Sequence, residues 1–126
     1  MFSRIVFPRA VRLGVTYLKE QTSYDVGRTR PKSLRKVTVT VHDDGGPDRG
    51  PLADRQMRFR IYGMAGAVDA AEDAAETVAA VLRDWPIHDS RVASIGPVRG
   101  PWVVSDVDAS PELLITADVT LIGATS

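Results

Sequence analysis

Apolar residues recur at helical spacing in two stretches of the chain. In the first, residues 8–21, they are Ala10, Val11, Gly14, Tyr17 and Leu18, with Phe7 just ahead. In the second, residues 67–84 and the adjoining Trp85, a stripe with steps of 3, 4, 3, 4 and 3 is formed by Val68, Ala71, Ala75, Val78, Leu82 and Trp85. These spacings predict two amphipathic helices whose apolar stripes face a core. Pro8 suits the first turn of the first helix, Pro86 is expected to end the second, and Gly14 predicts close packing or a kink.

Alternation with a period of two predicts strands on both sides of the second helix. The apolar positions are Val37, Val39 and Val41, then Met57, Phe59 and Ile61, and finally Leu113, Ile115, Ala117, Val119 and Leu121. These give strands at 37–42, 55–63 and 112–122, and shorter candidates lie at 24–30, 92–98 and 102–104. We therefore expect an α+β fold in the order α-β-β-β-α-β-β. Its sheet would be mixed and mostly antiparallel, with four to five strands and two helices packed on one face.

Residues 43–54 join two of the predicted strands and are rich in Gly, Pro and Asp. This segment is too long for a tight hairpin turn, and its composition disfavours regular structure. We expect the strands at 37–42 and 55–63 to pair antiparallel, with this segment as a protruding loop. Loops of about 12 residues in compact domains are usually functional or disordered, so the segment favours a partner-contacting arm over a solvated tip.

The composition is that of an ordinary globular domain. A chain of 126 residues with 44% hydrophobic residues predicts one domain, residues 1–126. With no Cys and two His, disulfides, thiolate zinc sites, cysteine nucleophiles and His-rich metal sites are excluded. Arg4, Arg9 and Arg12 interrupt any secretory signal, and no window approaches the roughly 18 apolar residues of a membrane span. We expect a soluble protein that stays in the cytoplasm where it is made.

Charge is balanced overall but not along the chain. Sixteen Lys and Arg oppose sixteen Asp and Glu, yet residues 1–36 carry nine basic and two acidic residues, a net charge of +7. Residues 37–60 carry four of each, and residues 61–126 carry three basic and ten acidic residues, a net charge of −7. Two interpretations stay open. The two ends could fold together and mix their charges on one surface, or the molecule could have two oppositely charged faces that stack head to tail with other copies.

No catalytic pattern is present. His88 and Ser90 are close in sequence, but no G-x-S-x-G motif accompanies them. The acidic run His42, Asp43, Asp44 and Asp48 lacks the spacing and final Glu of an EF-hand and is typical of a solvated turn. Asp106 and Asp108 are likewise typical of a turn. The sequence predicts no catalytic, cofactor or metal site, and a protein that is not an enzyme.

Five basic residues lie within nine positions, at Arg28, Arg30, Lys32, Arg35 and Lys36. Such a run can neutralise several phosphates, so a small nucleic-acid-binding α+β module is one interpretation. No aromatic residues are interleaved for base stacking, and no RNP or helix-turn-helix pattern is present, which disfavours sequence-specific binding. The other interpretation is a solvated surface or a salt-bridge site for a partner.

The layout of nearly the whole chain resembles the tail terminator proteins of tailed bacteriophages. The resemblance rests on the order of elements: the N-terminal helix, the segment 24–31, the strand 37–41, the Gly/Pro/Asp loop, the segment 54–63, the Ala/Glu-rich helix 67–85, Gly100-Pro-Trp102 with its acidic loop, and the closing strand 113–121. One departure is Ala65-Gly66 at the start of the second helix, where the family more often has a Ser, Thr or Asp cap.

The resemblance implies a structural role in the virion and no catalysis or cofactor. Such proteins form a ring, usually a hexamer, on the last ring of the tail tube, where they end tube polymerisation and present the surface to which the head connector attaches. The implied partners are other copies, the tube protein and the connector protein, and genomic DNA passes through the ring without sequence-specific binding. The implied location is the head-proximal end of the tail, after assembly in the host cytoplasm and without a membrane.

Contacts between subunits, or with the tube or connector, are expected in two segments. The basic segment supplies Arg28, Arg30, Lys32, Arg35 and Lys36, and the loop supplies Asp43, Asp44, Asp48 and Arg49.

Overall fold

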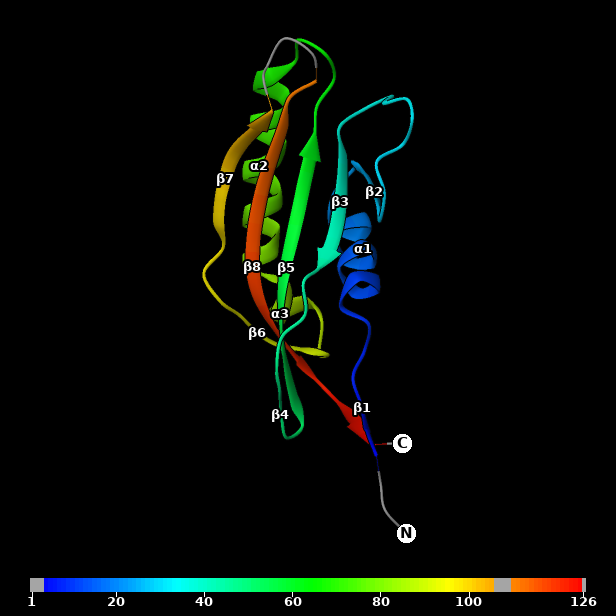
Figure 1. The fold of residues 1–126 in the computed structure, drawn as a ribbon, viewed down its shortest axis with the longest axis vertical. Helices are drawn as coiled ribbons and strands as arrows, with labels where there is room; N and C mark the ends of the chain where they lie inside the picture. The colour runs from blue at the N-terminus through cyan, green and yellow to red at the C-terminus, as the bar shows by residue number, and fades with distance from the viewer. Residues whose placement is uncertain (1–3, 106–109, 126) are drawn as a thin grey trace.

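The computed structural model describes residues 4–105 and 110–125. Along the chain lie β1 (Ile5–Val6), α1 (Ala10–Gln21), β2 (Asp25–Gly27), β3 (Thr38–Asp43), β4 (Asp48–Arg49), β5 (Leu52–Tyr62), α2 (Val68–Arg83), α3 (Trp85–His88), β6 (Val92–Ile95), β7 (Arg99–Ser105), β8 (Glu112–Ile122) and β9 (Ala124–Thr125). The molecule is elongated along its strands, and the two ends of the chain meet at one tip, where β1 pairs with β9 (Figure 1).

The main sheet has seven strands. Its order is β2-β3-β5-β8-β6, with β4 also pairing with β5 and β7 also pairing with β8. The β2–β3 pair is parallel and the other pairs are antiparallel. The longest ladder joins β5 and β8 over all eleven residues of each strand. An α+β fold with a mixed sheet is confirmed, but the predicted four to five strands and their order are wrong, because the two-residue strand β4 of this sheet and the separate β1–β9 ribbon are too short to show periodicity.

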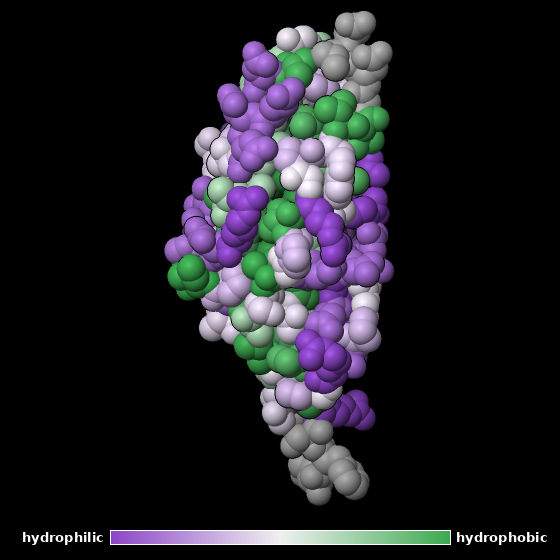
Figure 2. All heavy atoms as spheres, turned by 90° about the vertical axis from the view of Figure 1, so that its left-hand side faces the viewer, coloured by the Kyte–Doolittle hydropathy of each residue, from purple (hydrophilic) through white to green (hydrophobic). Residues whose placement is uncertain are grey.

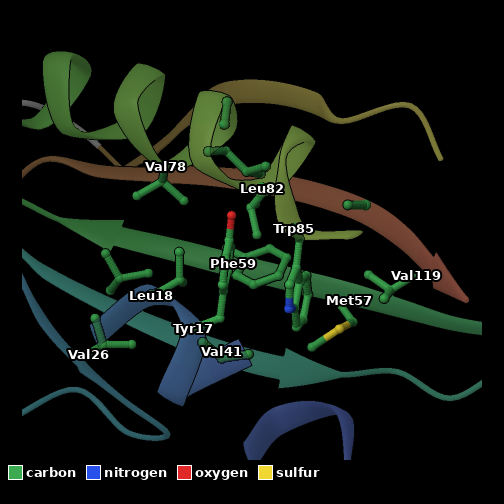
Figure 3. Packing of buried hydrophobic residues seen from close by; sticks show 14 of the residues in the cluster. Tyr17, Leu18, Val26, Val41, Met57, Phe59, Val78, Leu82, Trp85 and Val119 are labelled. Carbon is green, nitrogen blue, oxygen red and sulfur yellow. The ribbon is translucent and has the colours of Figure 1, made fainter. Parts of the chain in front are cut away.

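Helices α1 and α2 lie on the same face of this sheet and share one core with it. The alternating apolar residues of β5 and β8 point toward the helices, which supply Leu18, Val78 and Leu82 (Figure 3). Tyr17 of α1 links the helices to one another, because its ring stacks on Trp85 with centroids 5.3 Å apart and its hydroxyl donates to the Val81 carbonyl of α2. Burial and the negative charges of Asp84 and Asp89 raise the pKa of Tyr17 to about 12, so the hydroxyl stays a donor.

The helix ends differ slightly from prediction. Helix α1 begins at Ala10, so Pro8 precedes the helix and does not occupy its first turn. Helix α2 occupies Val68–Arg83, within one residue of the predicted ends. Pro86 does not act only as a stop, because Trp85–His88 form the short helix α3, which accommodates the proline in its first turn. Trp85 therefore reaches the core from α3, where it is fully buried.

The segment 43–54 is more regular than predicted. It contains β4, whose residues Asp48 and Arg49 pair with Ala53 and Leu52. A two-residue turn closes this hairpin, and Gly50 adopts a φ of 60° there, which favours glycine. The expectation of an irregular loop is thus wrong: β4 continues the hairpin that β3 forms with β5, after a short irregular stretch in which Gly45 and Gly46 have positive φ values. The predicted acidic turn with Asp106 and Asp108 lies outside the described residues.

Candidate partner-binding surfaces

The basic segment connects β2 with β3 and exposes all five of its predicted contact residues. Lys36 places its ammonium 3.6 Å from an Asp25 carboxylate oxygen and donates to the Ser23 carbonyl. Arg30 holds its guanidinium 5.1 Å from the centroid of the Tyr62 ring. Within residues 4–105 and 110–125, Arg28, Lys32 and Arg35 make no ion pair. This segment therefore carries cationic groups that have no ion-pair partner among the described residues.

The outer face of α2 carries the opposite charge. Its exposed acidic side chains are Asp69, Glu72, Asp73 and Glu76, and none of them forms an ion pair within the described part of the chain. Helix α2 lies over β5, β8 and β7, whereas the basic segment adjoins β2 and β3 at the other side of the sheet (Figure 1). Opposite charges are therefore separated across the width of the sheet, which favours the second interpretation of the charge asymmetry.

Charged side chains of the hairpin at 43–54 form ion pairs within the same chain. Arg49 forms a bidentate pair with Asp54 at 2.6 and 3.0 Å, and Asp54 also accepts a hydrogen bond from Thr120. The hydrogen bonds from Arg49 and Thr120 lower the pKa of Asp54 to about 2. Asp48 pairs with Arg55 at 3.0 Å. These contacts order the hairpin, so its charged residues are less available to a partner than those of the basic segment.

The remaining predicted loop residues are also engaged. Asp43 accepts a hydrogen bond from the Gly45 amide, and Asp44 lies 2.7 Å from Arg58. His42 lies 3.0 Å from the Thr40 hydroxyl, and burial together with nearby arginines lowers its pKa. Two aspartates of the acidic run, Asp44 and Asp48, thus form ion pairs with arginines. Within the described residues, no group of three or more His, Cys, Asp or Glu side chains is placed to hold one.

No known protein family matches this chain, and neither does any curated protein. Among residues 4–105 and 110–125, no helix is long and apolar enough to cross a membrane.

The corner that holds His88 and Ser90 is built around Asp89. This carboxylate accepts hydrogen bonds from the Trp85 indole N–H at 3.3 Å and from the backbone N–H and Nε of Arg91, each at 3.0 Å. Burial raises its pKa, but the three hydrogen bonds outweigh burial and lower it overall. Asp89 therefore ties α3 to the start of β6 and has a structural role.

This arrangement predicts a pH-dependent contribution to stability. Because the pKa of Asp89 is lower in the folded than in the unfolded chain, its contribution is complete above the unfolded pKa of about 4 and is lost as pH falls further. Asp89→Asn is expected to reduce the free energy of unfolding by about 1–2 kcal/mol at pH 7. Urea denaturation at pH 7 and pH 3 checks this, since the difference from wild type should shrink at pH 3. Asp73→Asn, on the exposed face of α2, should have no effect at pH 7.

A third surface has no counterpart in the sequence predictions. Strand β7 lies at the edge of the sheet, where the exposed fractions of Trp102, Val103 and Val104 are 48, 63 and 47%. Figure 2 looks onto this side of the molecule and shows hydrophobic surface over β7 beside hydrophilic side chains over α2. The sequence predicts a short strand at Trp102–Val104, and only the sheet order shows that it is an edge strand with an exposed apolar face.

Proposed function

We propose that this protein is a virion structural protein that forms a ring on the end of a phage tail tube. The ring ends tube polymerisation and provides the attachment surface for the head connector, and the protein is not an enzyme. The order of elements along the chain supports this proposal through its resemblance to tail terminator proteins. The basic and acidic sides of the sheet support it independently, because they are properties of the folded monomer.

The separation of charge across the sheet carries the proposal. A closed ring of identical subunits needs two different surfaces that complement each other on opposite sides of every subunit. Here the side next to β2 and β3 carries Arg28, Lys32 and Arg35, which form no ion pair within residues 4–105 and 110–125, and the side next to β8 carries the acidic face of α2. Bringing these sides together neutralises both, and electrostatic attraction also orients the encounter.

The two tips of the molecule, at opposite ends of the strands, differ from each other, as contacts with the tube protein and the connector protein require. If subunits join side by side, the strands run along the ring axis, and the tips of the molecule face the tube and the connector. The β4–β5 hairpin and the β1–β9 ribbon lie at one tip and differ from the connection between β5 and α2 at the other (Figure 1). Unlike axial faces are what a ring between two different partners requires. The internally paired charges of the hairpin keep its shape defined for such a contact.

Charge reversal provides the test. A base-reversed variant (Arg28, Arg30, Lys32 and Arg35 to Glu) has two acidic sides, and an acid-reversed variant (Asp69, Glu72, Asp73 and Glu76 to Lys) has two basic sides. We expect wild type to form rings by native mass spectrometry and negative-stain imaging, and each variant alone to stay monomeric. An equimolar mixture should again form rings, because the two variants can alternate around a ring with an even number of subunits, as in a hexamer.

Circular dichroism and thermal unfolding of the separate variants provide the control. All eight positions are exposed, so both variants should keep the wild-type fold. Rings formed equally well by each reversed variant would exclude the charged sides as the joining surfaces. A wild-type protein that stays monomeric at high concentration and in the presence of tail tubes would contradict the ring itself.

The exposed basic segment also supports the alternative of a small nucleic-acid-binding module. Fluorescence anisotropy with duplex DNA separates the two functions. Binding with a micromolar or lower Kd that weakens steeply with salt, and that the base-reversed variant loses, would favour the alternative. We expect no such binding by wild type at physiological salt.

A further inference from the structure

The two edge strands of the main sheet, β7 and β2, lie at the same height along the strand direction. Following the cross-strand pairs from Trp102 leads through Leu114, Arg60 and Thr40 to Gly27. The same path from Val103 leads through Leu113, Ile61 and Val39 to Val26. Strand β7 at one edge and β2 at the other therefore lie at the same height along the strand direction.

The directions of these two edge strands are opposite. Strand β7 runs antiparallel to β8, which runs antiparallel to β5, and β5 runs antiparallel to β3. Because β2 is parallel to β3, it runs opposite to β7. Copies related by rotation about an axis along the strands keep their strand directions. Such a rotation sets β7 of one copy antiparallel to β2 of the next, with no shift along the axis, as ring closure requires.

The edge at β2 has space for an aromatic side chain. A pocket of about 330 Å³ opens there, and its lining includes Tyr24, Gly27, Thr29 and Pro31. The space that a side chain at position 27 would occupy is open. A Cβ added to Gly27 would lie 4.0 Å from the Thr29 carbonyl oxygen, its nearest neighbour. An aromatic residue opposite a glycine on a neighbouring strand covers the exposed backbone of that glycine. Trp102 lies at the level of Gly27 at the other edge of the sheet.

We propose that Trp102 of one copy inserts into the β2 pocket of the next copy and is the apolar anchor of the joint between subunits. The inference rests on the proposed ring and names the surfaces that join it. Charge complementarity selects a second copy as the occupant: α2 beside β7 is acidic, and the flank beside β2 carries Lys19 of α1 and the basic segment. A central aromatic anchor with surrounding charges is the usual arrangement of a specific interface.

A donor variant and an acceptor variant test the joint. Trp102→Ala removes the anchor and leaves the pocket, whereas Gly27→Phe fills the pocket and leaves the anchor. We expect each variant alone to lose self-association by at least tenfold in native mass spectrometry and light scattering. An equimolar mixture should give a one-to-one dimer that does not grow, because only one of the two possible joints is intact. Ile87→Ala, at an exposed apolar position on α3, should assemble like wild type.

The outcomes separate this inference from the proposed function. If wild type and both variants form equivalent rings, the Trp102 joint is wrong and the ring stands. If wild type forms no assembly under any condition, both proposals are wrong. Should Gly27→Phe not fold by circular dichroism, Thr29→Trp at the exposed rim of the pocket replaces it as the acceptor variant. Trp102 fluorescence in a Trp85→Phe background should shift to the blue on assembly, and an unchanged spectrum in formed rings would contradict insertion.

Discussion

Trp85→Ala is expected to reduce the free energy of unfolding by about 3–5 kcal/mol. Trp85 is the largest fully buried side chain of the core, and it stacks on Tyr17 with an angle of 8° between the rings. Alanine would leave a cavity between α1, α3 and the sheet, and would remove the indole N–H that donates to Asp89. Because domains of this size are stable by about 5–15 kcal/mol, this loss is a large fraction of the total.

Urea denaturation followed by circular dichroism measures the effect. Trp102→Ala is the matched control, since it removes the same side chain from an exposed position and should change the stability of the monomer by less than about 1 kcal/mol. Trp85→Phe keeps a ring for stacking on Tyr17 but loses the donor to Asp89, so its loss should be intermediate. A Trp85→Ala loss no larger than that of Trp102→Ala would mean that the core does not depend on this residue.

Gly14→Leu is expected to destabilise the protein by about 3 kcal/mol through overpacking. A Cβ at Gly14 would lie 3.0 Å from the Val41 Cγ1 methyl and 3.5 Å from both Met57 Cε and Trp85 Cη2. Three further carbons have no room there unless α1 moves away from β3. The close approach predicted for this glycine from its place in a helix is confirmed, and no kink is needed to explain it.

Gly14→Ala provides the comparison. One methyl group requires Val41 to shift by a few tenths of an ångström, while alanine favours the helix by about 1 kcal/mol relative to glycine, so the two effects nearly cancel. Thermal unfolding of both variants gives the difference between the substitutions. Equal stabilities of the alanine and leucine variants would show that α1 can separate from the sheet at no cost.

Local periodicity explains why parts of the fold were predictable. The apolar stripe of α2, with five positions inside the helix, and the alternation in β8 each repeat one pattern over many residues, so the predicted bounds agree with the structure to within one residue. Short elements have no such repetition. Strand β4 exists because Gly45 and Gly46 redirect the chain so that Asp48 and Arg49 meet β5, and α3 forms where Asp84 ends α2.

The candidate surfaces show the same difference between features that follow from local sequence and features that follow from long-range contacts. The α+β class, the two long helices and the unequal charge of residues 1–36 and 61–126 could be predicted from the sequence alone, because they follow from composition and from patterns over neighbouring residues. Which charged side chains find a partner within the described residues depends on the folded arrangement of segments that are far apart in the sequence. Arg60 pairs with Glu112, which lies 52 positions away, whereas Arg28 and the acidic residues of α2 find no partner in the described chain. The exposure of Trp102 also depends on strand order, since long-range pairing alone determines which strand forms an edge.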